Sequence, residues 1–269
     1  MELDVNGHTT YCYTGGKTFD AARPTVVFIH GVLNDHSVWI LQTRWFANHG
    51  YNVLAPDLPG HGRSEGEPPA TVEAGAQFVF DLLDAAGVKA AALVGHSFGS
   101  LIAVEAAGSL PERVTHLAMV GTASPMKVSP ALLDASLNQP MKAIDMVNTF
   151  SHSMLAPPPS ALGPGTWVYG GSKALMKRVL ASNTRVNIFH TGFKACDSYT
   201  GGEAAMGRST CAVLFILGQD DMMTMPRMAQ PLVEKAGARG KVVLLRSGHQ
   251  LMNEAPDGVL FALRDFIKG

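Results

Sequence analysis

Residues 91–101 constrain the fold of this chain more than any other stretch. They read Ala-Ala-Leu-Val-Gly-His-Ser-Phe-Gly-Ser-Leu, an apolar run that continues into Gly-x-Ser-x-Gly at Gly95, Ser97 and Gly99. The apolar run predicts a buried strand, and the residues that follow predict a helix. A serine on such a tight strand-to-helix turn takes strained backbone angles, while the glycines let strand and helix approach closely. Its hydroxyl would project from the carboxyl edge of a sheet, beside the free N–H groups of a helix N-terminus.

Apolar runs that predict strands alternate with segments of helical periodicity on both sides of this motif. The expected strands cover residues 2–5, 9–13, 24–29, 51–55, 91–94, 116–121, 212–217 and 241–245. The clearest expected helices cover residues 71–86, 100–109, 226–236 and 256–267. This alternation implies right-handed crossovers. We therefore predict an α/β fold with a mostly parallel eight-stranded sheet flanked by helices.

The alternation stops between residues 124 and 207, where no clear strand is found and helical patches cover 130–150 and 172–186. This segment is rich in methionine and aromatic residues. We interpret it as a helical cap inserted after strand six, and assign residues 1–123 and 208–269 to the core. Among its apolar side chains we expect Met126, Trp167 and Phe189 to contact a substrate, together with Met222 from the core.

Composition and charge exclude several classes of function. The net charge is −1 and no basic run is present, which argues against nucleic acid or an anionic membrane as a partner. Three scattered cysteines do not suit a disulfide framework or a zinc site. The first residues are acidic rather than basic as in a signal peptide, and no apolar run approaches the ~18 residues of a membrane span. We therefore predict a cytoplasmic protein that acts on a small molecule.

Five motifs at the ends of expected strands resemble those of the α/β-hydrolase fold family, in its branch with a helical cap. They are His30-Gly31, Asp57-x-x-Gly-x-Gly-x-Ser64, the turn at Ser97, Gly218-x-x-Asp221, and Gly248-His249 followed by Glu254-Ala255-Pro256. They occur in the family's order and span nearly the whole chain. The resemblance implies a nucleophilic serine, an acid and a histidine base, which follow one another along the chain in that order.

Ser97 is the expected nucleophile, and its hydroxyl needs a neighbouring base because it is almost fully protonated at neutral pH. We assign this base to His249, which follows the last expected strand and would reach the same sheet edge. His61 and His96 also lie near that edge. His96 adjoins the nucleophile and is expected to point away from it.

A carboxylate must hold the imidazole of the base in the correct tautomer. Asp220 and Asp221 compete for this role, and the family spacing Gly-x-x-Asp favours Asp221. The loop from Asp57 to Ser64 has too few glycines to hold a phosphate. We interpret it as a structural turn and expect no metal site.

Attack on a carbonyl creates an oxyanion that needs N–H donors. The resemblance implies two backbone donors, the N–H of Phe98 and that of Val32. Leu33 and Asn34 follow in the same loop, and we expect them to line the substrate pocket. His30 is interpreted as a brace for this loop.

These features predict a serine hydrolase that cleaves the carboxylic ester of a small, apolar substrate through an acyl-enzyme, without a metal or organic cofactor. The same triad also suits a carbon–carbon bond hydrolase, a lactonase, a thioesterase or an acyltransferase. Dehalogenases and epoxide hydrolases are disfavoured, because relatives of those kinds carry aspartate where Ser97 stands. A ligand receptor with the hydrolase fold and slow turnover remains an alternative from another class.

Overall fold

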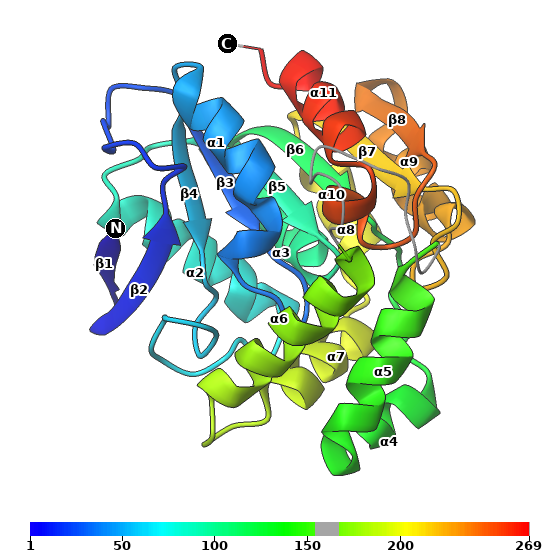
Figure 1. Ribbon diagram of the computed structural model, residues 1–269. Helices are drawn as coiled ribbons and strands as arrows, with labels where there is room; N and C mark the ends of the chain where they lie inside the picture. The colour runs from blue at the N-terminus through cyan, green and yellow to red at the C-terminus, as the bar shows by residue number, and fades with distance from the viewer. Residues whose placement is uncertain (154–166, 269) are drawn as a thin grey trace.

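The computed structural model describes residues 1–153 and 167–268 (Figure 1). Its strands form one eight-stranded sheet in the order β1-β2-β4-β3-β5-β6-β7-β8. The strands are β1 (Glu2–Val5), β2 (His8–Tyr13), β3 (Thr25–Ile29), β4 (Asn52–Pro56), β5 (Ala91–His96), β6 (Val114–Val120), β7 (Ala212–Gly218) and β8 (Gly240–Leu245). β2 pairs antiparallel with both β1 and β4. All pairings from β4 to β8 in this order are parallel. The predicted fold class is confirmed.

Helices cover both faces of this sheet. The α-helices are α1 (Ile40–Asn48), α2 (Val72–Ala85), α3 (Phe98–Ser109), α4 (Pro130–Asn138), α5 (Pro140–Ser151), α6 (Val168–Ser182), α7 (Ile188–Ser198), α8 (Gly202–Arg208), α9 (Gln230–Ala236), α10 (Leu251–Glu254) and α11 (Pro256–Phe266). α1 and α11 lie side by side on one face, and α2, α3 and α8 pack on the other (Figure 1). Among the described residues, no helix has both the length and the apolar character to cross a membrane.

The central strands are apolar throughout because both of their faces are covered. In β3 every residue is buried, and successive side chains alternate between two hydrophobic clusters. Val27 and Ile29 belong to the cluster that includes α2 and α3, whereas Val26 and Phe28 belong to the one that includes α1 and α11. Because successive side chains of a strand point to opposite faces of the sheet, β3 contributes to both hydrophobic clusters.

Between β6 and β7 the chain forms an insertion, which we define as helices α4–α7. It lies at the lower end of the molecule in Figure 1. The expected helical patch at 130–150 divides into α4 and α5 at Pro140, which occupies the first helical turn where its missing N–H costs nothing. Residues 154–166 of the predicted cap lie outside the described residues.

The insertion has a hydrophobic cluster of its own, distinct from the two cores. Its buried members come from all four helices, with one contribution from the core loop after β3, Leu33. α8 is different: it packs against α3, and Ala205 and Met206 belong to the core cluster. The chain therefore packs on the core from α8 onwards, whereas the sequence analysis placed the start of this second core segment at residue 208.

Candidate active site

Ser97 occupies the turn between β5 and α3 with the strained backbone expected from its motif. Its φ is +53°, a value that non-glycine residues rarely adopt. The glycines on either side are required by space, because a Cβ at Gly95 would collide with the carbonyl group of Gly99. A Cβ at Gly99 would in turn collide with the carbonyl group of Ile29. Phe98 is the first residue of α3, where backbone N–H groups have no intrahelical partner.

His249 and Asp221 form a buried pair at the same edge of the sheet. Asp221 follows β7, His249 follows β8, and His249 Nδ1 lies 2.8 Å from Asp221 Oδ2. Burial alone would raise the pKa of Asp221, but the charge of His249 and hydrogen bonds from His249 and Thr224 outweigh it and hold the pKa below its ordinary value. Asp220, the competing acid, is exposed, and its backbone N–H donates to the carbonyl of Ser247.

Thr224 completes this arrangement and was not anticipated from the sequence. Its hydroxyl donates to Asp221 Oδ2 at 2.8 Å and its Oγ1 lies 3.1 Å from His249 Nδ1. The backbone N–H groups of Met223 and Thr224 both donate to Asp221 Oδ1. An aspartate followed two and three residues later by such donors is a local turn pattern, so the spacing Asp-x-x-Thr was the signal that could have identified Thr224.

The other two histidines considered as bases contact backbone instead. His96 Nε2 lies 2.9 Å from the carbonyl oxygen of His249, and the two rings pack at 4.7 Å between centroids. His61 Nδ1 lies 3.0 Å from the carbonyl oxygen of Pro59. Burial lowers the pKa of His96 to about 3 and that of His61 to about 4. Both imidazoles are therefore neutral at physiological pH and hold the loops around the site.

Glu254, which belongs to the last of the five sequence motifs, makes contacts that the sequence did not predict. Its carboxylate accepts the backbone N–H of Gly248 at 2.7 Å and both the N–H and hydroxyl of Ser153. The N–H of Gln250 also donates to the carbonyl of Ser151, at the end of α5. The loop that carries His249 is thus fastened to the end of α5 on both sides of this histidine.

Ser97 and His249 line one cavity of about 260 Å³ between the core and the insertion. Most of its other lining side chains are apolar and several are methionines. They include Met126, Val128, Leu132, Met146, Phe150, Phe193, Cys196, Met222 and Met223, with Lys127, Ser129 and Thr224 as the polar members. The structure thus brings together two of the expected substrate-contacting residues, Met126 and Met222, with Ser97 and His249.

The remaining expected pocket residues lie elsewhere. Leu33 and Phe189 are fully buried in the hydrophobic cluster of the insertion, and Asn34 is also buried, in the loop after β3. Trp167 lines a separate hollow beside α6 together with Arg178. Apolar character alone did not distinguish a side chain that faces the cavity from one that packs between helices.

The loop after β3 lies directly against Ser97. A Cβ at Gly31 would come within 3.1 Å of Ser97 Cβ and 3.0 Å of His96 Nδ1, so a larger residue at this point would crowd both side chains. His30 braces the loop as expected, because its Nδ1 lies 2.8 Å from the carbonyl of Gly31 and its Nε2 accepts the N–H of Leu58. Val32, the expected second donor, immediately follows Gly31 and thus belongs to a segment that adjoins Ser97.

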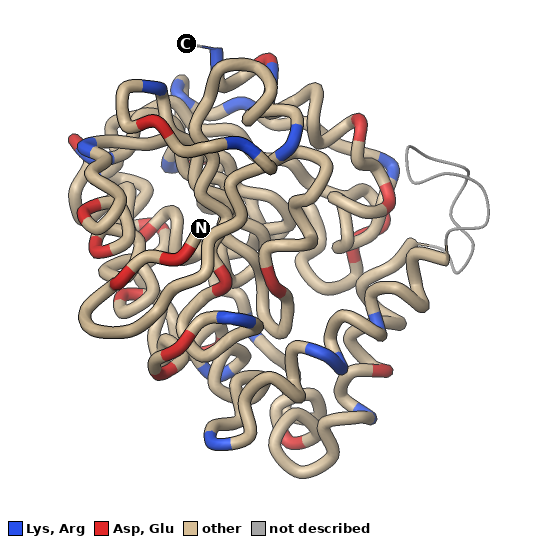
Figure 2. The backbone as a smooth tube through the Cα atoms, turned by 60° about the vertical axis from the view of Figure 1, so that its left-hand side comes forward, with Lys and Arg blue, Asp and Glu red and all other residues tan. Residues whose placement is uncertain are grey.

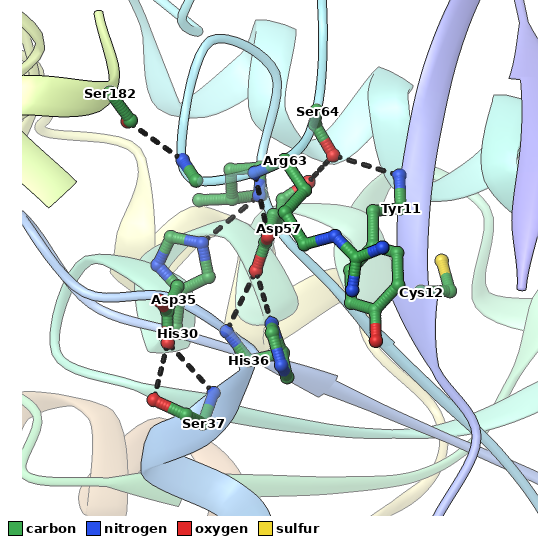
Figure 3. Close-up of polar contacts among 12 residues, drawn as sticks. Tyr11, Cys12, His30, Asp35, His36, Ser37, Asp57, Arg63, Ser64 and Ser182 are labelled. Atoms are coloured by element: carbon green, nitrogen blue, oxygen red, sulfur yellow. Dashed lines mark hydrogen bonds and ion pairs between the residues drawn. The ribbon is translucent and has the colours of Figure 1, made fainter. Parts of the chain in front are cut away.

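The loop from Asp57 to Ser64 is a turn built around a buried carboxylate (Figure 3). Asp57 Oδ1 accepts the backbone N–H of His36 at 2.9 Å and lies 2.7 Å from His36 Nδ1, and Oδ2 accepts the N–H of Arg63 at 2.9 Å. The hydroxyl of Ser64 donates to the carbonyl of Asp57. These contacts are those of a structural turn.

Asp35, His36 and Asp57 each offer one possible metal-ligand atom, and these three atoms lie within 4.8 Å of one another. Their oxygens already have partners, however. Asp35 Oδ1 accepts the N–H and hydroxyl of Ser37 (Figure 3), and Asp35 Oδ2 pairs with Arg178 at 2.7 Å. A cation here would have to displace a guanidinium and several N–H donors, so this cluster does not suit a metal.

Comparison with known proteins now decides the family. Residues 26–262 match the model of the alpha/beta hydrolase family. The chain belongs to this family. It is 39% identical over 119 residues to the dihydrolipoyllysine-residue acetyltransferase component of the acetoin cleaving system of Cupriavidus necator, a match that covers 44% of this chain and 30% of that protein. It is 34% identical over 119 residues to lipase LipV of Mycobacterium tuberculosis, covering 43% of this chain and 44% of the lipase.

The chain thus spans less than half the length of these two relatives. An esterase from Exiguobacterium antarcticum has the same fold, with a TM-score of 0.83 at 16% identity over 100% of this chain and 99% of that one. Membership of the alpha/beta hydrolase family supports a hydrolytic enzyme.

Acidic and basic residues are interspersed over the molecule, in keeping with its net charge of −1 (Figure 2).

Proposed function

We propose that this alpha/beta hydrolase is a serine hydrolase that cleaves the carboxylic ester of a small, apolar substrate through an acyl-enzyme. One observation carries the proposal: Ser97, on its strained turn, shares a cavity with His249, and His249 is hydrogen-bonded to the buried Asp221. A nucleophile, a base and a carboxylate that orients the base are the three groups needed for this chemistry.

In the proposed acylation step, His249 Nε2 takes the proton of Ser97 Oγ as the oxygen attacks the ester carbonyl. Asp221 accepts the hydrogen bond from His249 Nδ1–H, which selects the tautomer with a free Nε2 lone pair. The tetrahedral oxyanion is stabilised by the backbone N–H groups of Phe98 and Val32. The intermediate collapses when His249 returns its proton to the leaving alcohol, and Ser97 remains acylated.

In the proposed deacylation step, His249 takes a proton from water, and the hydroxide formed attacks the acyl carbonyl. The second oxyanion uses the same N–H donors, and the carboxylic acid leaves as Ser97 Oγ regains its proton. Replacing water with another alcohol or a thiol would make the same acyl-enzyme an acyltransferase. Similarity to an acetyltransferase component over 44% of the chain favours testing that second candidate.

The cavity supports an apolar acyl or alcohol group as the part of the substrate that is recognised. Four methionines line it: Met126, Met146, Met222 and Met223. Thioether side chains are flexible and polarisable, and they accommodate apolar groups of varied shape. We therefore expect a preference for apolar over charged acyl groups, with tolerance of chain shape rather than strict selection.

Labelling with a fluorophosphonate, mapped by mass spectrometry, tests the nucleophile. We expect one adduct at Ser97, and Ser97→Ala should lower kcat on a chromogenic ester by a factor on the order of 10⁶. Absence of an adduct from the wild-type protein would refute the nucleophile assignment. An adduct without multiple turnover would instead favour the receptor alternative, and turnover only with an added alcohol or thiol would favour the acyltransferase.

A further inference from the structure

The loop after β3 is strained at Leu33, one residue beyond the proposed oxyanion donor. The N–H of Asn34 donates to the carbonyl of Gly31 and closes a tight turn, in which Leu33 has a φ of +55°. That position of a turn favours glycine or asparagine, because the left-handed conformation crowds a Cβ. Such strain persists only where the surrounding structure determines the conformation, so the contacts of Leu33 indicate what holds this loop.

Both apolar side chains of this loop pack against the insertion, and Val32 also packs against the core. Leu33 is fully buried in the hydrophobic cluster of the insertion, among residues of α4–α7 such as Ile144 and Phe189. Val32 packs against α7 at Gly192, where an added Cβ would come within 3.1 Å of the valine side chain. The residue that offers the N–H and the residue that strains the turn therefore both contact the insertion.

An ion pair fastens the same loop to α6. Arg178 Nη2 lies 2.7 Å from Asp35 Oδ2, and the aspartate side chain is only 5% exposed. α6 continues this contact at its C-terminal end, where the hydroxyl of Ser182 accepts the backbone N–H of Gly62 (Figure 3). The neighbouring Asn183 donates from Nδ2 to the carbonyl of Gly60. These polar contacts thus join α6 and Asn183 to two core loops, the loop after β3 and the loop from Asp57 to Ser64.

We propose that Leu33 and Arg178 are positioning residues that tie the oxyanion loop to the helical insertion, so that the N–H of Val32 is aimed at the reacting carbonyl only while the insertion is seated. This inference rests on the proposed function, because it assigns the N–H of Val32 to an oxyanion. The other donor, the N–H of Phe98, belongs to the turn between β5 and α3, whose conformation is set by core glycines.

The two donors consequently respond differently to a disturbance of the insertion. Loss of the contacts of Arg178 and Leu33 displaces the N–H of Val32, whereas Phe98 lies in a turn set by core glycines, and the loop of His249 is fastened elsewhere, at the end of α5. Complete loss of one oxyanion donor lowers kcat about 10²–10³-fold in other hydrolases. A donor that is loosened rather than removed should cost on the order of tenfold.

Arg178→Gln tests the tie, and the chain offers a matched control on the same helix. Lys173 on α6 pairs with Asp145 on α5, wholly inside the insertion, and the side chains of Lys173 and Arg178 are both partly exposed to solvent. Lys173→Gln therefore removes an ion pair from the same helix without touching the oxyanion loop. Arg178→Lys keeps the charge and should restore most of the lost activity, and Leu33→Ala removes the apolar anchor.

Three measurements separate positioning from general loosening. In Arg178→Gln we expect faster amide hydrogen exchange in peptides covering residues 31–35, and about tenfold lower kcat with KM nearly unchanged. The downfield proton of the Asp221–His249 hydrogen bond should be unchanged in an NMR spectrum. Leu33→Ala should lower kcat further, and Lys173→Gln should match the wild-type protein in all three measurements.

Unchanged exchange in both Arg178→Gln and Leu33→Ala would overturn the inference, as would equal losses in Arg178→Gln and Lys173→Gln. Faster exchange with unchanged kcat would refute the catalytic role of the tie. If Ser97→Ala retained wild-type turnover, the proposed function would fail instead. The exchange measurement would still decide whether Arg178 holds the loop, since it does not depend on activity.

Discussion

Two carboxylate–imidazole pairs of nearly the same geometry, Asp221–His249 and Asp57–His36, occur among the residues that the structure describes. The histidine Nδ1 lies 2.8 Å from a carboxylate oxygen in the first pair and 2.7 Å in the second, and neither aspartate side chain has any exposed surface. In both pairs burial would raise the pKa of the carboxyl group, and hydrogen bonds and the histidine charge lower it below the ordinary value.

The difference lies in the surroundings of the imidazole. The ring of His249 lines the cavity that also contains Ser97. The ring of His36 packs edge-on against Tyr11, with centroids 4.9 Å apart, and lies beside Tyr13. By itself, therefore, a buried aspartate–histidine pair only holds two loops together. A neighbouring nucleophile and an open cavity make one of these pairs a candidate catalytic group.

The largest expected contrast is in turnover. Asp221→Asn should lower kcat about 10⁴-fold, because the amide stabilises the wrong tautomer of His249 and no longer supports its cation. Asp57→Asn should leave kcat within the same order of magnitude, since His36 does not reach the cavity. Steady-state kinetics on one ester would check both variants. Comparable losses in the two variants would show that the Asp57–His36 pair contributes to the reaction, and would break the comparison.

The second contrast is in stability. Asp57 accepts the backbone N–H groups of His36 and Arg63 as well as the imidazole, so Asp57→Asn places an amide NH₂ against one of these donors. We expect a loss of about 1–3 kcal/mol in the free energy of unfolding. Asp220→Asn, at an exposed position, should change it by less than about 0.5 kcal/mol. Urea unfolding midpoints measure both, and equal midpoints for the two variants would contradict the expectation.

The smallest contrast concerns pH, because each region also contains a buried neutral histidine. The pKa of His96, beside His249, is about 3, and that of His61, near Asp57, is about 4, in both cases because burial disfavours the cation. Between these values and the ordinary pKa of about 6.5, the unfolded chain binds more protons than the folded one. Stability should therefore fall as pH drops below about 6.5, by up to about 1.4 kcal/mol per pH unit for each histidine.

His61→Gln and His96→Gln should each reduce the slope of the unfolding free energy against pH by the contribution of the histidine that is removed. Unfolding free energies measured from pH 7 down to pH 4.5 would check it. A wild-type stability that stays constant over that range, or variants with the same slope as the wild-type protein, would show that these two histidines are protonated in the folded state.

The sheet and its carboxyl edge were predictable because their signals are local. The β-branched run in β3, the glycines around Ser97 and the spacing Gly-x-x-Asp at Asp221 each reflect a constraint within a few residues. The choice between Asp220 and Asp221 could be made from that spacing, and the geometry agrees, since Asp221 is the one hydrogen-bonded to His249.

The pocket residues were harder to predict, because helical periodicity does not say which neighbour a side chain meets. Leu33 and Phe189 are as apolar as Met126 and Met222, but they pack within the insertion, whereas the two methionines line the cavity. For Thr224, the spacing Asp-x-x-Thr predicts a turn, but the folded turn is needed to show that its hydroxyl meets both Asp221 and His249.

The sequence by itself therefore determined the fold class, the family and the small set of residues that could act as nucleophile, base and acid. These follow from strand runs, glycines at close approaches and the order of motifs along the chain. Only the tertiary structure decided that Met223 and Thr224 share a cavity with Ser97 and which helices hold the loop of Val32. Those relations join residues more than 100 positions apart, and they arise from packing between elements rather than from any local preference.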